Sequence, residues 1–203
     1  HVSALGHKAL LVYGQHSIKK SGLYDKIVSQ LQDADIAFVE HGGVKSNPSL
    51  AHTREGIAKA RAEKVDFVIA VGGGSVIDEA KSIAAGAVAE DDVWRFYLGE
   101  AKIEKALPLA TVLTLPATGS EMNGNAVITN DETNDKLGLA SPYFYPRVSI
   151  LDPSLTVTVP SRYTAASAVD IVSHLTESYF TNDGGWTPLQ EYYVEGLVKT
   201  VMA

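Results

Sequence analysis

The chain has 203 residues, carries a net charge of −7 and contains no cysteine. The absence of cysteine excludes disulfides, cysteine-ligated zinc and thiol nucleophiles, and it agrees with a reducing cytoplasm. The acidic balance argues against nucleic acid and anionic membrane surfaces as partners, and no stretch of about 18 apolar residues is present to span a membrane.

Apolar runs and helical periodicities alternate through the first third of the chain. We predict strands at 8–14 and 36–40, because short apolar runs of this kind are typical of buried parallel strands. A helix is predicted at 21–34, with Ser21 as its N-cap. A second helix is predicted at 47–64, opened by an Asn-Pro pair.

The alternation continues and then gives way to helix. Residues 65–89 read as strand, glycine turn and helix, 107–118 contain a strand, and 126–157 carry two or three strand-like runs. The order predicts an α/β fold with a doubly wound parallel sheet. The pattern becomes helical at its end, which predicts an α/β domain over 1–158 and a helical domain from 159–203.

The segment VIAVGGGSVIDEAK places three glycines, 72–74, between an apolar strand and a helix. Glycines allow a ligand close to the backbone, and the free N–H groups at a helix start attract phosphate. The spacing is neither G-x-G-x-x-G nor a P-loop, so a tight turn without a ligand is the alternative. Ser75 and Asp78 are expected in the first helical turn, with Asp78 acting as a dipole partner or a hydrogen-bond acceptor.

The segment TLPATGSEMNGN follows a predicted strand and is dense in hydroxyl and amide side chains. Such a loop could hydrogen-bond a ribose, a carboxamide or phosphates. The residues alone favour the other interpretation, in which the loop satisfies its own backbone.

Asp170 and His174 are four residues apart in a predicted helix and therefore share one face. A carboxylate and an imidazole suit a divalent transition metal, but two ligands do not complete a site. The other histidines lie in the first quarter of the chain without metal-like spacing. From these residues alone, a hydrogen bond on the helix surface is the preferred interpretation.

The segments VGGGSVIDEAK, TLPATGSEMNGNAVIT, ILDPSLTVTVP and AVDIVSHLTESY occur in this order. Their order resembles the iron-containing (group III) alcohol dehydrogenases, and VYGQHSIKKSGLYDKI resembles the NADP-dependent butanol dehydrogenase and aldehyde reductase branch. The resemblance covers nearly the whole chain. It implies a Rossmann-like, dehydroquinate-synthase-like domain, then the start of an all-helical domain, in a homodimer. The implied reaction transfers a hydride between NADP(H) and a small primary alcohol or aldehyde, such as butanol or butanal.

The resemblance also implies one metal ion, Fe²⁺ or Zn²⁺, held in the cleft between the two domains by one Asp and three His. Asp170 and His174 match the Asp and the first His. The other two ligands would lie beyond residue 203. The chain begins without Met and its last helical pattern has no Gly or Pro stop, so we expect it to be a piece of a longer protein.

The resemblance further implies a set of cofactor-binding residues, whereas no general base is identified. The matching residues are Gly14, Ser17, Asn47, Gly73, Gly74, Ser75, Asp78, Thr114, Thr118, Asn123, Val127 and Lys136. The glycine turn corresponds to the pyrophosphate site, and the loop with the following strand corresponds to the surroundings of the nicotinamide and its ribose. Lys136 corresponds to a lysine that reaches the nicotinamide ribose, although by itself it reads as a solvated turn lysine. Asn47 corresponds to the adenine side.

The segment YGQHSIKK bears on the choice between NADP and NAD. NAD-preferring relatives carry an Asp at the position of Gln15, which would repel a 2′-phosphate. Here Gln15, His16 and Ser17 can all donate hydrogen bonds to a phosphate. The NADP-preferring branch often reads Gly-Gly-Gly-Ser, so Gln15 and His16 depart from it, but the resemblance still favours NADP.

Two other functions fit parts of the pattern. A relative such as glycerol dehydrogenase or a dehydroquinate-synthase-like lyase shares the sheet and the glycine turn, but TLPATGSEMNGNAVIT fits the alcohol dehydrogenases better. A truncated, non-catalytic nucleotide-binding module is the alternative if the natural chain ends at Ala203.

Overall fold

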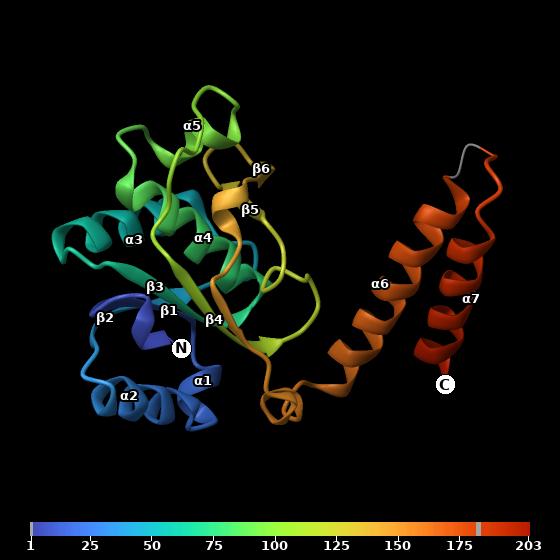
Figure 1. Ribbon diagram of the computed structural model, residues 1–203, viewed down its shortest axis with the longest axis horizontal. Helices are drawn as coiled ribbons and strands as arrows, with labels where there is room; N and C mark the ends of the chain where they lie inside the picture. Colours follow the sequence, from blue (N-terminus) through green and yellow to red (C-terminus); the bar gives the residue numbers. More distant parts are fainter. Residues whose placement is uncertain (1, 182–183) are drawn as a thin grey trace. The chain divides into compact units, whose positions relative to one another are not determined.

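Five of the predicted apolar runs form one parallel sheet in the computed structural model, which describes residues 2–181 and 184–203 (Figure 1). The strands are β1 (Lys8–Gly14), β2 (Ala37–Val44), β3 (Phe67–Gly73), β4 (Leu109–Leu115) and β7 (Val148–Ile150). They lie in the order β2-β1-β3-β4-β7, and every neighbouring pair is parallel. The prediction of a doubly wound, Rossmann-like α/β fold is confirmed.

Successive side chains of a strand point to opposite faces of the sheet, and in the central strands both sets are apolar. Helices therefore cover both faces of this sheet. On β1, Leu10 and Val12 belong to one apolar cluster, whereas Leu11 and Tyr13 belong to another. The first cluster is completed by α3 (Leu50–Ala62), α4 (Gly74–Val88) and α5 (Val93–Tyr97), and the second by α1 (Ser17–Lys20) and α2 (Leu23–Asp33). The sheet is thus the middle of three layers.

A separate antiparallel hairpin packs against α4. Its strands are β5 (Asn125–Asn130) and β6 (Asp135–Ala140). The backbone N–H of Thr129 donates to the carbonyl of Pro48 over 2.9 Å. The hairpin is therefore joined both to α4 and to the segment that precedes α3.

Two helices begin later than the sequence predicts. Ser21 is not the N-cap of α2, because its N–H donates back to α1 and Gly22, with φ of 76°, occupies the N-cap position. Asn47 does not open α3 either, since its φ of 56° is left-handed and a residue before proline avoids the helical region. Ser49 is the N-cap, and its Oγ accepts from the N–H of His52 over 3.3 Å.

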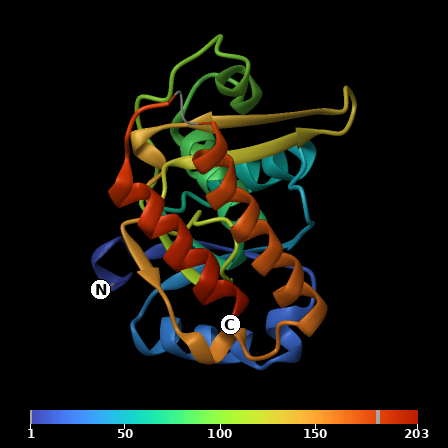
Figure 2. The same ribbon diagram turned by 90° about the vertical axis from the view of Figure 1, so that its right-hand side faces the viewer.

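The chain divides into two compact units, His1–Thr156 and Val157–Ala203. In the second unit, α6 (Ser161–Phe180) and α7 (Pro188–Met202) pack against each other as an antiparallel pair (Figure 2). None of the described residues of this unit is buried. Within the described part of the chain, no helix combines the length and apolarity that crossing a membrane requires.

Truncation of Ile83 tests the packing of α4. Ile83 is fully buried in the first cluster, so Ile83→Ala in the natural full-length protein should lower the free energy of unfolding by about 2–5 kcal/mol. Leu98→Ala is the control, because Leu98 is 49% exposed, and it should cost less than about 1 kcal/mol. Equal losses in urea denaturation would contradict the assignment of α4 to the core.

Candidate cofactor cradle and metal-ligand pair

The carboxyl ends of β1 and β3 mark the point where the chain reverses its direction across the sheet. From β1 the next strand lies on one side, and from β3 the next strand lies on the other. Ligands of open parallel sheets bind outside the strand ends at such a switch point. Gly14 is the last residue of β1, Gly73 is the last of β3, and Thr114 is next to last in β4. The fold therefore brings three of the predicted cofactor residues to one edge.

The glycine turn leaves the first turn of α4 open. Gly73 is the N-cap and offers no side-chain cap, so the first N–H groups of α4 keep their capacity to donate. A Cβ atom at Gly74 would lie 2.2 Å from Oγ1 of Thr118, which shows why glycine is needed there. The turn can therefore accept an anion at the positive end of the helix dipole, with Thr118 beside it.

Asp78 is a hydrogen-bond acceptor inside the fold. The prediction that it lies in the first turn is wrong, because α4 begins at Gly74 and Asp78 comes a turn later. Its Oδ1 accepts from Oγ of Ser120 over 2.6 Å, and its Oδ2 accepts from the N–H of Val127 over 3.1 Å. Burial raises the pKa of Asp78, although both hydrogen bonds oppose this rise. Asp78 thereby fixes the loop and the start of the hairpin to α4.

Lys81 is the main residue that the sequence interpretation missed. It is fully buried, and its Nζ donates to Oγ of Ser120 over 2.8 Å. The same Nζ donates to the carbonyls of Asn123 over 2.9 Å and Asn125 over 2.7 Å. Burial lowers the pKa of Lys81 to about 8. The signal in the sequence was a lysine three residues after Asp78, between the apolar positions of α4.

The loop after β4 is held by its own backbone as well as by α4. Oγ1 of Thr118 accepts from the N–H of Ser120 over 3.3 Å, and Oδ1 of Asn123 accepts from the N–H of Asn125 over 2.9 Å. These bonds fit the interpretation of a loop that satisfies its own backbone. The same loop places Thr118 beside Gly74, so the two interpretations are compatible.

Asn47 and Lys136 meet although they are far apart in the sequence. Nζ of Lys136 donates to Oδ1 of Asn47 over 2.8 Å. Asn47 lies in the turn before α3, and Lys136 lies in β6. At the other end of the predicted set, Gln15, His16 and Ser17 are exposed after β1, where they remain accessible to a ligand.

Asp170 and His174 face each other on α6. Oδ2 of Asp170 lies 3.6 Å from Nε2 of His174, and both side chains are exposed. At this separation the two side chains form an ion-pair contact on the exposed face of the helix, longer than a hydrogen bond. Ligand atoms lie about 2.0–2.2 Å from a zinc-like ion, so one ion could contact both atoms. The pair thus fits two of the donors of a divalent metal.

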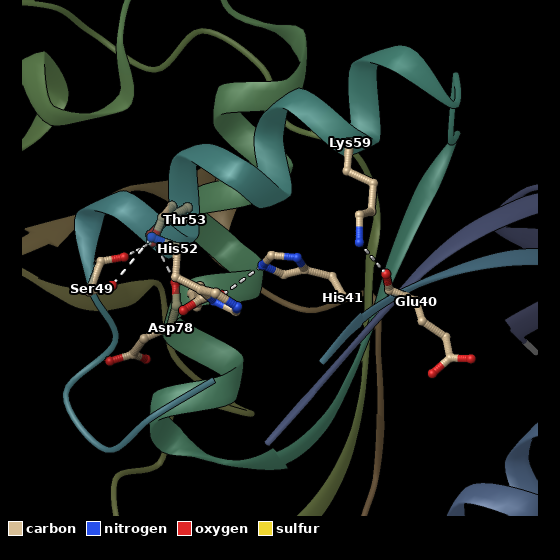
Figure 3. A network of polar contacts seen from close by, with 9 residues as sticks. Glu40, His41, Ser49, His52, Thr53, Lys59 and Asp78 are labelled. Carbon is tan, nitrogen blue, oxygen red and sulfur yellow. Dashed lines mark hydrogen bonds and ion pairs between the residues drawn. The ribbon is translucent and has the colours of Figure 1, made fainter. Parts of the chain in front are cut away.

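A second group of potential metal ligands could not be predicted from the spacing of the histidines in the sequence. In the first unit, the rings of His41 and His52 lie against each other (Figure 3). Both rings also contact the carboxylate of Glu79. A strand and two helices supply these residues, so only the fold makes them neighbours.

The comparisons with known proteins agree with this geometry. The profile of the family described as iron-containing alcohol dehydrogenase matches residues 1–153. The chain is 47% identical to the probable NADH-dependent butanol dehydrogenase 1 of Bacillus subtilis, over 97% of this chain and 51% of that protein. It is 37% identical to the NADPH-dependent aldehyde reductase YqhD of Escherichia coli, over 96% of this chain and 50% of that protein. Among solved structures, the NADH-dependent butanol dehydrogenase A of Thermotoga maritima is similar with a TM-score of 0.90 and 49% identity, over 97% of this chain and 49% of that one.

The chain therefore belongs to the iron-containing alcohol dehydrogenase family, as its ordered motifs indicated. It spans about half the length of the curated relatives it matches. Its sheet is the nucleotide-binding type of fold that the resemblance implied.

The pH dependence of stability tests the burial of Lys81. The pKa is lowered from 10.5 to about 8, so between these values the unfolded chain binds more protons than the folded one. The free energy of unfolding of the natural full-length protein should therefore rise with pH over this range, relative to Lys81→Met, by up to about 1.4 kcal/mol per pH unit.

Lys26→Met is the control, because Lys26 is exposed on α2. Its difference from the wild type should stay constant over the same range in urea denaturation. A constant difference for Lys81→Met as well would contradict the lowered pKa.

Proposed function

We propose that this chain is the cofactor-binding part of a metal-dependent alcohol dehydrogenase or aldehyde reductase. The whole enzyme would transfer a hydride between NADPH and a small primary alcohol or aldehyde such as butanal. The observation that carries the proposal is the uncapped start of α4 at the switch point of the sheet, where Gly74 leaves room for Thr118.

The pyrophosphate would accept hydrogen bonds from the first N–H groups of α4, at Gly74 and Ser75. Asp78 and Lys81 would not contact the cofactor. Their buried hydrogen bonds would hold the loop after β4 in position. That loop would orient the nicotinamide half of the cofactor through Thr118. The nicotinamide supplies the redox chemistry, and the protein's part is to bind and orient it.

The other proposed cofactor-binding residues would contact the parts of the cofactor on either side of the pyrophosphate. Gly14 ends β1, which neighbours β3 in the sheet, and Ser17 begins α1. Both would lie beside the adenosine half of the cofactor. Lys136 would donate to a hydroxyl oxygen of the nicotinamide ribose, and Asn47, which accepts from Lys136, would face the adenine side of the cofactor. Thr114, Asn123 and Val127 complete the set of residues proposed to surround the cofactor.

Asp170 and His174 are the residues that would hold the metal, Fe²⁺ or Zn²⁺. Their oxygen and nitrogen donors, 3.6 Å apart on one helix face, fit such an ion. A bound divalent metal would serve as a Lewis acid for the substrate oxygen. Two donors leave the site incomplete within the described residues, so further ligands would come from additional chain.

We propose a preference for NADPH from the residues that follow β1, which would face the 2′-phosphate of this cofactor. No carboxylate occurs among residues 14–20, whereas Gln15, His16 and Ser17 offer donors to a 2′-phosphate. The names of the relatives point both ways, since the Bacillus subtilis protein is named NADH-dependent and the Escherichia coli protein NADPH-dependent.

Replacing either proposed metal ligand tests the function. In the natural full-length protein, Asp170→Ala and His174→Ala should each lower NADPH-dependent butanal reduction by at least about 100-fold, because losing a ligand weakens metal binding. Metal content should fall in parallel, while NADPH fluorescence should still report cofactor binding.

Glu195→Ala is the matched control. Glu195 and Lys199 form the same i,i+4 pair on α7, also at 3.6 Å, and this variant should keep its metal and activity. Absence of metal and turnover in the wild type, with NADPH still bound, would instead identify a non-catalytic nucleotide-binding module.

Gln15→Asp tests the cofactor preference. The new carboxylate would repel a 2′-phosphate and accept from a 2′-hydroxyl, so the ratio of kcat/KM for NADPH to that for NADH should fall by about tenfold or more. Gln15→Asn, which adds no charge, should leave the ratio near the wild-type value. A wild-type preference for NADH, or an unchanged ratio in Gln15→Asp, would contradict the proposal.

A further inference from the structure

Three side chains that no step of the proposed function uses meet in the interior of the first unit. His41 is on β2, His52 is in the first turn of α3, and Glu79 is on α4. His41 and Glu79 are buried, and the side chain of His52 is 25% exposed. The cluster therefore lies inside the fold, with one ring that reaches the surface.

The two imidazoles converge on a single carboxylate oxygen. Nε2 of His41 lies 3.1 Å from Oε1 of Glu79, and Nδ1 of His52 lies 2.7 Å from the same atom. The two rings are stacked with centroids 4.2 Å apart. Figure 3 shows the labelled histidines turned toward one another from the strand and the helix. Three potential ligand atoms thus lie within 4.8 Å of one another.

The second oxygen of Glu79 is unsatisfied among the described residues. Oε2 is buried and has no hydrogen-bond partner in that part of the chain. An ionised carboxylate without full compensation is costly in the interior. The buried second oxygen of Glu79 is therefore able to accept a further ligand beside the two imidazoles.

We propose that His41, His52 and Glu79 bind a divalent cation of the zinc class, in addition to the metal proposed for Asp170 and His174. Two imidazole nitrogens and one carboxylate are a ligand set that zinc uses in proteins, with water in the fourth position. The same set disfavours Ca²⁺ and Mg²⁺, which take oxygen ligands. The ion would take the place of the imidazole protons that face Oε1, which would be released to solvent, and its positive charge would compensate that of the carboxylate.

Such an ion would link β2, α3 and α4. Glu79 directly follows Asp78 on α4, and Asn47 lies in the turn before α3, which carries His52. The ion would therefore hold two segments that carry proposed cofactor-binding residues, without contacting the cofactor. The role is structural, because none of the three residues contacts Gly73 or Thr118 through a described bond. The stability of α4, rather than the hydride transfer, would depend on this ion.

Metal titration of a background variant isolates this site. The natural full-length protein carrying Asp170→Ala and His174→Ala is stripped with a chelator and titrated with Zn²⁺, and with Co²⁺ for its visible absorption. It should bind about one equivalent and gain thermal stability from it. Adding His52→Asn should weaken Zn²⁺ binding by about 100-fold or more and remove the cobalt bands.

His7→Asn in the same background is the matched control, because His7 is an exposed histidine outside the cluster. It should retain the equivalent of metal. Glu79→Gln is a second variant that keeps the side-chain shape, and it should lose the metal as His52→Asn does. No metal bound by the background protein, or equal binding with and without His52→Asn, would overturn the proposal.

Discussion

The buried ammonium group of Lys81 holds the loop after β4 and the start of β5 against α4. Its hydrogen bonds reach Ser120, Asn123 and Asn125, and Ser120 passes the connection on to Asp78. A buried charge is tolerated only when it is paired and hydrogen-bonded, so α4 and the loop after β4 must keep this arrangement. The first N–H groups of α4 remain available to a ligand because the N-cap, Gly73, has no side chain to accept from them.

Much of the fold could be predicted from the sequence, because five apolar runs of strand length alternate with helical periodicity. The starts of α2 and α3 could not, since they depend on backbone conformations at Gly22 and Asn47 that apolar spacing does not encode. The glycine turn was predictable because three consecutive glycines, 72–74, lie between an apolar run and a helical pattern. Lys81 was missed for a different reason: a charged side chain inside a helix reads as exposed until the tertiary acceptors are known.

The two groups of candidate metal ligands differ in how far the sequence alone could predict them. Asp170 and His174 could be paired from the sequence because one helix sets their separation, and the structure places their ligand atoms 3.6 Å apart. His41, His52 and Glu79 could not, because β2, α3 and α4 each contribute one residue and only the packing of α3 on α4 makes them neighbours. Local spacing predicts sites within an element, whereas sites between elements require the fold.

We propose that the start of α4 anchors the cofactor. A crystal structure of the natural full-length protein with NADPH tests this anchor. We expect pyrophosphate oxygens within hydrogen-bond distance of the N–H groups of Gly74 and Ser75, with Thr118 against the bound cofactor. A pyrophosphate bound away from this turn, with the first N–H groups of α4 facing solvent, would contradict it.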